Sequence, residues 1–371
     1  MTLLRIALCL LAVFGCAVAE MYCPTAPSDP QDRRTNTSLF RFVHFNAEWL
    51  YIDGYDDCPG SGCPWEDDEA AHHHLHSIAD VLAELDADLI NLAEVESCDE
   101  LHDLLQTDAL RNGHYSPYMV QGKDTSTGQD VGMLTRVDPQ QDLFRTENRV
   151  EYPLPSTQCT STYTGTYGVS KHYITTLDVN DIPLAVISCH LLAFPDDENR
   201  CVQREAQVSV MAEVVGEYVS RGYEVIFTGD FNDFDSAVVD ANNNLPISQV
   251  MDIATGGHSH AHAKGHSHAA SFSSSSKAAA EGVGAGAGAD TGWTLHNVAS
   301  LMPQSDRYTI WWDSNSDCVY GQNETSMIDH VLVTPGLLQR VSGVFFDHTA
   351  FTPSCESFYS DHWPLVVDFV F

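Results

Sequence analysis

Apolar residues along this chain recur with two different spacings, which predict strands alternating with helices. Short runs of mostly apolar residues are typical of buried strands, and they occur at 40–50, 88–95, 131–136, 171–179, 183–192, 223–228, 327–333 and 364–371. Apolar residues that recur every three or four positions instead predict helices over 67–86, 99–106 and 199–220. Because several neighbouring strands are joined by short loops, we expect an α/β protein with a mixed sheet.

The first residues of the chain depart from this pattern. Residues 1–19 combine a positive charge at Arg5, an apolar stretch and the small residues Ala17-Val18-Ala19, which is the pattern of a cleaved secretory signal. The apolar stretch is too short to span a bilayer comfortably, so we favour cleavage over a signal anchor. Residues 20–39 then form an N-terminal extension, and residues 40–371 form the main domain.

A second departure lies inside that domain, at residues 255–290. This segment consists almost wholly of Gly, Ala, Ser and His, which predicts a flexible, exposed insertion. Its histidines are His258, His260, His262, His266 and His268. They suit a tract that binds divalent metal or responds to pH, but a low-complexity loop that tolerates histidine is the simpler interpretation, which we favour.

Composition narrows the class of protein. The 371 residues are 43 % apolar and carry a formal net charge of −35. The apolar fraction excludes a disordered chain, and the length is enough for a large core. The charge excludes a protein that holds nucleic acid by a broad basic surface, but it leaves room for a site that meets a phosphate through a metal ion.

Cysteines and glycosylation signals agree with export. Nine cysteines remain once the signal is removed, so disulfides are expected, with at least one cysteine left unpaired. Cys58 and Cys63 are spaced to close a small loop. The sequence contains no C-x-x-C pair, which disfavours a zinc site. Asn36 and Asn323 each begin an N-glycosylation sequon.

Polar or ionisable side chains flank six of the apolar strand segments. They are Asn46, Glu48, Glu94, His190, Asp230, Asn232, Asp329, Asp361 and His362. One such strand end would be unremarkable, but six make chance a poor explanation. If the strands lie side by side, their ends meet at one rim of the sheet, where α/β proteins tend to place their sites.

These segments resemble the motifs of the endonuclease/exonuclease/phosphatase superfamily, also called deoxyribonuclease I-like. The matching motifs, in the family's order, are Asn46-Ala-Glu48, Ala93-Glu94-Val95, Ser188-Cys-His190, Gly229-Asp-Phe-Asn232, Ile328-Asp-His330 and Ser360-Asp-His362-Trp-Pro364. Arg307-Tyr-Thr and Gln129-Asp-Val-Gly also look like segments of its exported nucleases. The resemblance implies a four-layer α/β sandwich, in which two packed mixed β-sheets are flanked by helices.

The resemblance also implies hydrolysis of a phosphodiester, and the residue types suit that reaction. Hard oxygen ligands hold Mg²⁺, which neutralises the charge that develops on the phosphate oxygens. Glu94 is the best candidate ligand, and Glu48 and Asp361 are additional ones. Mn²⁺ is a candidate substitute ion, and the surplus of acidic residues also suits structural Ca²⁺.

The histidines, aspartates and asparagines are expected to act on the proton and the phosphate. His362 is the candidate general base, and Asp329 would orient it. His190 would protonate the leaving oxygen or donate a hydrogen bond to the phosphate. Asp230 would orient the nucleophile or bind metal, and these two roles stay open. The neutral donors Asn46 and Asn232 would fix the phosphate.

Basic residues near the site are few, and three are candidate phosphate contacts. Lys171, at the start of the strand that precedes the one ending in His190, resembles a basic contact that many members of the family provide as arginine. Arg136 and Arg307 are further candidates. For all three, an ordinary surface charge is an equally good interpretation.

Export, the nuclease-like segments and the lack of a lipid anchor favour nucleic acid, DNA or RNA, as the substrate. The negative charge opposes long-range attraction, so binding is expected to be weak, with little sequence preference. No protein partner and no stable membrane anchor are expected.

Two alternatives remain. One is a secreted sphingomyelinase-like enzyme or another phosphoester hydrolase of the superfamily, with Trp49, Trp65, Trp311 and Trp312 as an apolar rim. The other is a non-catalytic protein that binds metal through the histidine-rich insertion.

Overall fold

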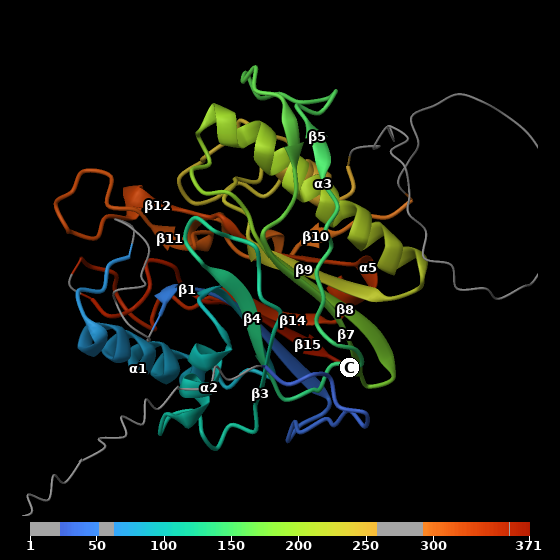
Figure 1. The fold of residues 1–371 in the computed structure, drawn as a ribbon, viewed down its shortest axis with the longest axis vertical. Coiled ribbons are helices and arrows are strands. Elements are labelled where there is room, and N and C mark those ends of the chain that lie inside the picture. Colours follow the sequence, from blue (N-terminus) through green and yellow to red (C-terminus); the bar gives the residue numbers. More distant parts are fainter. Residues whose placement is uncertain (1–22, 52–62, 258–291, 356) are drawn as a thin grey trace, which may run out of the picture.

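Two β-sheets lie face to face through the middle of the protein (Figure 1). The computed structural model describes residues 23–51, 63–257, 292–355 and 357–371. The strands of the six-stranded sheet are, in order, β14 (Val341–Phe346), β15 (Leu365–Val370), β1 (Leu39–Leu50), β2 (Leu89–Val95), β4 (Asp130–Thr135) and β3 (Ser116–Met119). Those of the five-stranded sheet are β10 (His296–Asn297), β13 (Asp329–Val333), β9 (Glu224–Asp230), β8 (Ile182–His190) and β7 (Lys171–Val179).

Helices cover the outer faces of both sheets. Helices α1 (Asp68–Leu85) and α2 (Cys98–Gln106) pack on the six-stranded sheet, and α3 (Glu198–Ser220) with the short α4 (Val250–Ala254) packs on the five-stranded sheet (Figure 1). The sequence of layers is therefore helix, sheet, sheet, helix, and both sheets mix parallel and antiparallel pairs. This confirms the expected four-layer α/β sandwich.

Smaller elements complete the chain. They are the pairs β5 (Val150–Tyr152) with β6 (Gly165–Tyr167) and β11 (Ile310–Trp311) with β12 (Thr325–Ser326), helix α5 (Pro335–Leu338), and the 3₁₀ turns Val298–Leu301, Gln304–Asp306 and Gln322–Glu324. Within the described residues, no helix has both the length and the apolar character needed to cross a membrane.

Strand alternation decides which side chains meet between the sheets. In β1, Phe40 and Phe42 belong to the core between the two sheets, whereas Val43 and Phe45 pack against α1 and α2. Because side chains alternate along a strand, His44 and Asn46 lie on the same face as Phe42. Polar residues at such positions are therefore aimed at the opposite sheet rather than at water.

The strand directions bring the polar ends to one edge of both sheets. β1 runs parallel to β2, and β8 runs parallel to β9, so Asn46, Glu94, His190 and Asp230 all lie at strand ends that point the same way. β13 runs antiparallel to β9, and its first residue, Asp329, pairs with Asp230. The predicted meeting of strand ends is thus observed.

All predicted strands and helices are present, but three edge strands of the two main sheets, β3, β14 and the two-residue β10, were not predicted. β3 is a short Ser-Pro-Tyr-Met segment, and β14 is largely half-buried or exposed, so neither shows the apolar run of a central strand. The strand predicted at 223–228 also continues to Asp230, which places that carboxylate inside the strand rather than after it.

Three disulfides lie within the described residues: Cys23–Cys98, Cys159–Cys201 and Cys318–Cys355. Cys189 is a buried free thiol, in agreement with the expectation of at least one unpaired cysteine. Outside the described residues lie the signal at 1–19, nearly all of the 255–290 insertion, and the predicted Cys58–Cys63 loop except for Cys63 itself.

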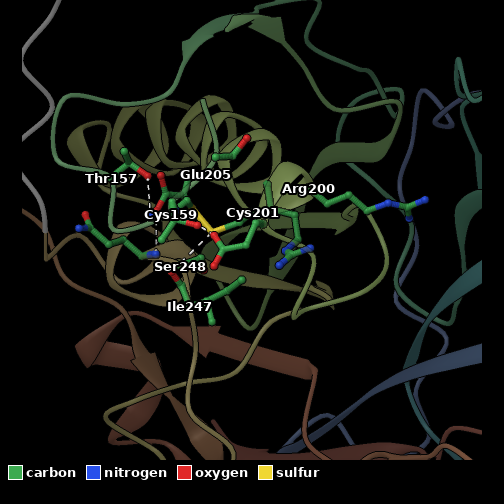
Figure 2. Close-up of a disulfide and its surroundings, with 12 residues drawn as sticks. Thr157, Cys159, Arg200, Cys201, Glu205, Ile247 and Ser248 are labelled. Carbon is green, nitrogen blue, oxygen red and sulfur yellow. Dashed lines mark hydrogen bonds between the residues drawn. A yellow bond between two sulfur atoms is a disulfide. The ribbon is translucent and has the colours of Figure 1, made fainter. Parts of the chain in front are cut away.

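Figure 2 shows the Cys159–Cys201 disulfide, which joins the loop before β6 to the first turn of α3. Its cysteines are 42 residues apart, so it restricts a long stretch of the unfolded chain. Replacing both Cys159 and Cys201 with serine should lower the free energy of unfolding by about 2–4 kcal/mol. Denaturant unfolding of this variant, with Cys189→Ala as the control for loss of a free thiol, measures the effect. An unchanged unfolding midpoint would show that the crosslink does not stabilise the fold.

Candidate active site

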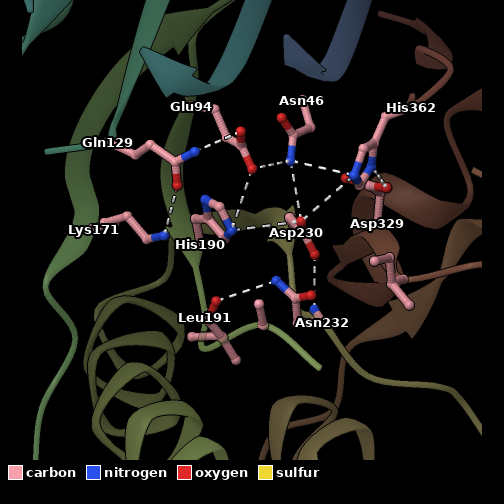
Figure 3. Close-up of polar contacts among 12 residues, drawn as sticks. Asn46, Glu94, Gln129, Lys171, His190, Leu191, Asp230, Asn232, Asp329 and His362 are labelled. Carbon is pink, nitrogen blue, oxygen red and sulfur yellow. Dashed lines mark hydrogen bonds and ion pairs between the residues drawn. The ribbon is translucent and has the colours of Figure 1, made fainter. Parts of the chain in front are cut away.

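The polar strand ends form one cluster at the edge of the two sheets (Figure 3). The Asn46 side-chain amide lies at its centre and donates to Glu94 Oε1 at 3.2 Å and to Asp230 Oδ2 at 3.1 Å. His190 Nε2 lies 3.9 Å from Glu94 Oε1 and 3.6 Å from Asp230 Oδ2. His362 Nε2 lies 4.0 Å from the same Asp230 oxygen. Groups from both sheets thus share one small volume.

Glu94 reaches this cluster because β2 is irregular at its end. Strict alternation would point Glu94 toward the helices, on the same face as Ile90 and Leu92. Instead, the pairing register of β2 shifts between Ala93 and Val95 against β4, and Glu94 has a positive φ of 63°. This is a β-bulge, which re-aims one side chain, and here it turns the carboxylate into the site.

Three further carboxylates crowd the same edge. Burial raises the pKa of Glu48 well above its usual value, and the neighbouring Asp361 and Glu94 add to the shift. Burial, together with Asp329, raises the pKa of Asp230 to about 8. Burial also raises the pKa of Asp361 to about 6. Burial, with a smaller contribution from the neighbouring carboxylates, therefore disfavours the charged form of each group in the free protein.

This donor set fits a divalent cation. Among the described residues, four groups of acidic, histidine or cysteine side chains are close enough to hold a metal ion, and two of these contain disulfide sulfurs, which are not free to bind. The other two share Asp230: Glu94 with His190, and Asp329 with His362, with ligand atoms within 4.8 Å of one another. Carboxylate oxygens are the ligands that Mg²⁺ prefers.

His362 and Asp329 form a close buried pair. His362 Nδ1 lies 2.7 Å from Asp329 Oδ2, and both side chains are almost fully buried. Burial opposes the charged form of each, but their mutual attraction outweighs it, raising the pKa of His362 and lowering the pKa of Asp329. In the neutral form of the ring, Nδ1 donates to the carboxylate, so the unprotonated His362 Nε2 faces the cluster and can accept a proton.

His190 is held in its neutral form. Burial lowers the pKa of His190 well below its usual value, and the nearby Lys171 and His362 charges act in the same direction. Burial likewise lowers the pKa of Lys171, whose ammonium group contacts Gln129 Oε1 at 3.3 Å. A neutral His190 keeps one ring N–H to donate toward a phosphate oxygen.

Asn232 also lies at the edge, with part of its hydrogen-bonding capacity already used. Its backbone N–H donates to Asp230 Oδ1 at 2.8 Å, and its side-chain amide donates to the Leu191 carbonyl at 3.2 Å. Asn232 therefore fixes the turn after β9 and the orientation of Asp230.

Asp361 is held by Glu48, because the Glu48 carboxylate accepts a hydrogen bond from the backbone N–H of Asp361 at 2.8 Å.

Two predicted phosphate contacts are not brought to this cluster. Arg136 follows β4 at the end where Thr135 pairs with Leu89, which is the opposite end of the sheet from Glu94. Its guanidinium binds Asp86 and lies over the Tyr115 ring, because β4 runs antiparallel to β2.

Arg307 donates to the Met302 and Val239 carbonyls, at 2.8 and 3.2 Å. Within the part of the chain that the structure describes, no hydrogen bond or ion pair joins Arg307 to the site.

Two residues in contact with the site were not predicted as site residues, although Gln129 begins one of the motifs that resemble the family. Gln129 donates to Glu94 Oε2 at 2.6 Å and so links Glu94 to Lys171. His44 lies 2.9 Å from Asp329 Oδ1. The alternation of side chains along β1 is a signal that could have identified His44, because His44 precedes Asn46 by two residues and so lies on the same face of the strand.

The raised carboxyl pKa values predict that cation binding depends on pH. A cation must displace protons from Asp230, whose pKa is about 8, and from Asp361, whose pKa is about 6. Affinity for Mg²⁺ should therefore increase as pH rises through this range, with release of protons on binding. Titration calorimetry in buffers of different ionisation enthalpy measures both effects. Affinity that does not change with pH would contradict this electrostatic description.

Several solved structures are similar to this chain over most of its length. The 3'-5' exonuclease NExo from Neisseria meningitidis has a TM-score of 0.52 and 15 % identity, with 90 % of this chain and 100 % of that chain covered. A variant of the 3' phosphatase NExo from Neisseria, bound to a product DNA hairpin, has a TM-score of 0.52 and 14 % identity, with 90 % of this chain and 100 % of that chain covered. Truncated TDP2 from Caenorhabditis elegans has a TM-score of 0.47 and 15 % identity, with 90 % of this chain and 97 % of that chain covered. The comparison with curated proteins finds no match.

The family comparison covers most of the sequence. Residues 45–362 match the model of the Endonuclease/Exonuclease/phosphatase family, a span that begins just before Asn46 and ends at His362. Enzymes of this family generally use divalent metal ions. The match includes every strand end that contributes to the cluster described above. The chain belongs to the Endonuclease/Exonuclease/phosphatase family.

Proposed function

We propose that this protein is an exported, Mg²⁺-dependent phosphodiesterase that hydrolyses nucleic acid by attack of water on phosphorus. The observation that carries the proposal is the convergence of Glu94, His190, Asp230 and the His362–Asp329 pair at one edge of the two sheets. A carboxylate-rich cation site, a proton acceptor and a neutral donor are what this reaction needs.

Glu94 and Asp230 would hold the ion, with Glu48 and Asp361 contributing negative charge or further oxygen ligands beside them. When bound, Mg²⁺ supplies positive charge that stabilises the developing charge on the phosphate oxygens. Mn²⁺ would act as a substitute because it accepts the same oxygen ligands.

The remaining groups handle the proton and the substrate. His362 Nε2 would take a proton from water, while Asp329 keeps Nδ1 protonated and stabilises the imidazolium that forms. His190 would donate to the leaving or a non-bridging oxygen. Asn46 and Lys171 would contribute a neutral and a cationic donor to the phosphate.

Nucleic acid is the substrate class we favour. The two NExo structures that share this fold are described as a 3'-5' exonuclease and as a 3' phosphatase bound to a DNA hairpin. The net charge of −35 predicts weak binding, because few basic side chains are present to neutralise phosphates. The electrostatic attraction that remains at the site should decrease as salt is added.

The sphingomyelinase alternative has less support. An apolar rim needs exposed tryptophans, yet Trp65 and Trp311 are each only 5 % exposed and belong to the protein interior. Trp312 is exposed, but a single exposed tryptophan is common on protein surfaces.

Export itself is supported by the three disulfides and by the exposed positions of Asn36 and Asn323.

A substrate panel tests the proposed function. Purified protein is incubated with plasmid DNA, single-stranded DNA, RNA and sphingomyelin vesicles, each with Mg²⁺ and with chelator, and the nucleic-acid product ends are mapped. We expect Mg²⁺-dependent cleavage of nucleic acid. Release of choline phosphate from the vesicles without nucleic-acid cleavage would instead support the sphingomyelinase alternative, and inactivity on every substrate would remove the enzyme proposal.

A further inference from the structure

A chain of buried hydrogen bonds runs from the core between the sheets to the back of the His362–Asp329 pair. The Tyr173 hydroxyl lies 2.7 Å from Asn91 Oδ1, Asn91 Nδ2 lies 2.7 Å from His44 Nδ1, and His44 Nε2 lies 2.9 Å from Asp329 Oδ1. Tyr173 and Asn91 have no exposed surface, and His44 is 1 % exposed. The chain crosses from β7 through β2 and β1 to β13, so it links both sheets.

The chemistry of these groups fixes the direction of every hydrogen bond. The Tyr173 hydroxyl donates to Asn91 Oδ1, because an amide oxygen only accepts. The Asn91 amide nitrogen then donates to His44 Nδ1, which must accept and so carries no proton. The proton of the neutral His44 ring is therefore on Nε2, where it donates to Asp329 Oδ1.

The opposite orientation of Asn91 is much less favourable. It would place the amide oxygen against His44 Nδ1, so both ring nitrogens of His44 would face acceptors and require a buried imidazolium. It would also leave the Tyr173 hydroxyl proton without the Asn91 acceptor. Buried polar groups that lose their partners cost about 1–3 kcal/mol each. The observed arrangement leaves no such group among these contacts.

We infer that His44 is a positioning residue for the reaction, one that holds the Asp329 carboxylate through Oδ1 so that Oδ2 is fixed toward His362. This inference rests on the proposed function. Asp329 receives one imidazole on each oxygen, at 2.9 Å from His44 and 2.7 Å from His362. With both oxygens held, the carboxylate cannot rotate, and His362 keeps Nε2 aimed at the cluster. His44 itself does not face the substrate.

A neutral donor suits this position better than a cation. Asp329 must remain an anion to stabilise the His362 imidazolium during proton transfer. A buried lysine or arginine in place of His44 would compete with His362 for the negative charge of Asp329. A neutral N–H satisfies the second carboxylate oxygen without taking over that charge.

The test compares His44→Leu, which removes the donor, with His44→Gln, whose amide N–H replaces Nε2–H. We expect His44→Leu to lower kcat by about ten- to a hundredfold with little change in KM, since partners of catalytic groups typically contribute this much. His44→Gln should recover most of kcat. His330→Leu is the matched control, because His330 is also buried and follows Asp329 but contacts Asp233 and Asn297 instead. It should lower stability without the same loss of kcat.

A second readout needs no turnover. In the free protein, the His362 Nδ1–H proton should give a low-field NMR resonance that His362→Ala removes, that His44→Leu shifts or broadens and that His44→Gln retains. Folded His44→Leu protein with the kcat and the resonance of the wild type would overturn the inference. An inactive wild type with the predicted resonance changes would instead refute the proposed function and leave the positioning geometry supported.

Discussion

Replacing His362 with alanine is expected to lower kcat by about 10²–10⁴ while leaving the protein folded, because general-base catalysis typically contributes this much. His362 Nε2 is the imidazole nitrogen that faces the carboxylate cluster, while Nδ1 is committed to Asp329. Loss of the ring removes the proton acceptor but leaves the cation ligands in place. KM should therefore change far less than kcat.

Steady-state kinetics on a defined oligonucleotide measures this effect. His76→Ala is the control, since His76 is exposed on α1 and lies outside the cluster. Asp329→Asn should give a comparable loss, because an asparagine amide in place of the carboxylate no longer stabilises the imidazolium. Wild-type kcat in folded His362→Ala protein would exclude His362 as the base.

Removal of the divalent cation should abolish hydrolysis, and Glu94→Gln should reproduce much of that loss at low Mg²⁺. The glutamine keeps the shape of the side chain, but it removes one negative charge from the cation site and one of the two oxygens that accept from Asn46 and Gln129. We expect the Mg²⁺ concentration for half-maximal activity to rise by about tenfold or more.

Activity is titrated against Mg²⁺ after treatment with chelator, and restoration by added Mg²⁺ shows that the protein was not simply unfolded. Glu84→Gln is the matched control, because Glu84 is an exposed glutamate on α1. Equal Mg²⁺ dependence for Glu94→Gln and the wild type would show that Glu94 does not hold the ion.

The strands, their mixed directions and most of the cluster could be predicted from local patterns in the sequence, whereas the pairing of two sheets was implied by the resemblance to the family. Apolar runs indicate strands, and polar residues at their ends mark the edge where Asp230, His190 and Asp329 meet. Side chains also alternate between the two faces of a strand, and this alternation is regular along β8, β9 and β13. These features need no knowledge of long-range register.

Other features depend on register and on irregularity, which no local pattern specifies. Glu94 enters the site only through a bulge with a positive φ, which strict alternation would not have predicted. The motif that ends in Arg136 follows the motif of Glu94 along the chain, but β4 runs antiparallel to β2, so Arg136 lies at the far end of the sheet. The sequence alone did not reveal this strand direction. The role of His44 required knowing that β1 and β13 face each other across the core.

Hydrolysis in ¹⁸O-labelled water most directly tests the central claim that water attacks phosphorus at this site. Wild-type protein is incubated with a defined oligonucleotide and Mg²⁺, and the products are analysed by mass spectrometry beside those of His362→Ala protein. We expect one ¹⁸O atom on each newly formed phosphate end with the wild type, and an amount of labelled product with the variant that is reduced in proportion to its lower kcat. Label on the released hydroxyl, or equal cleavage by both proteins, would contradict it.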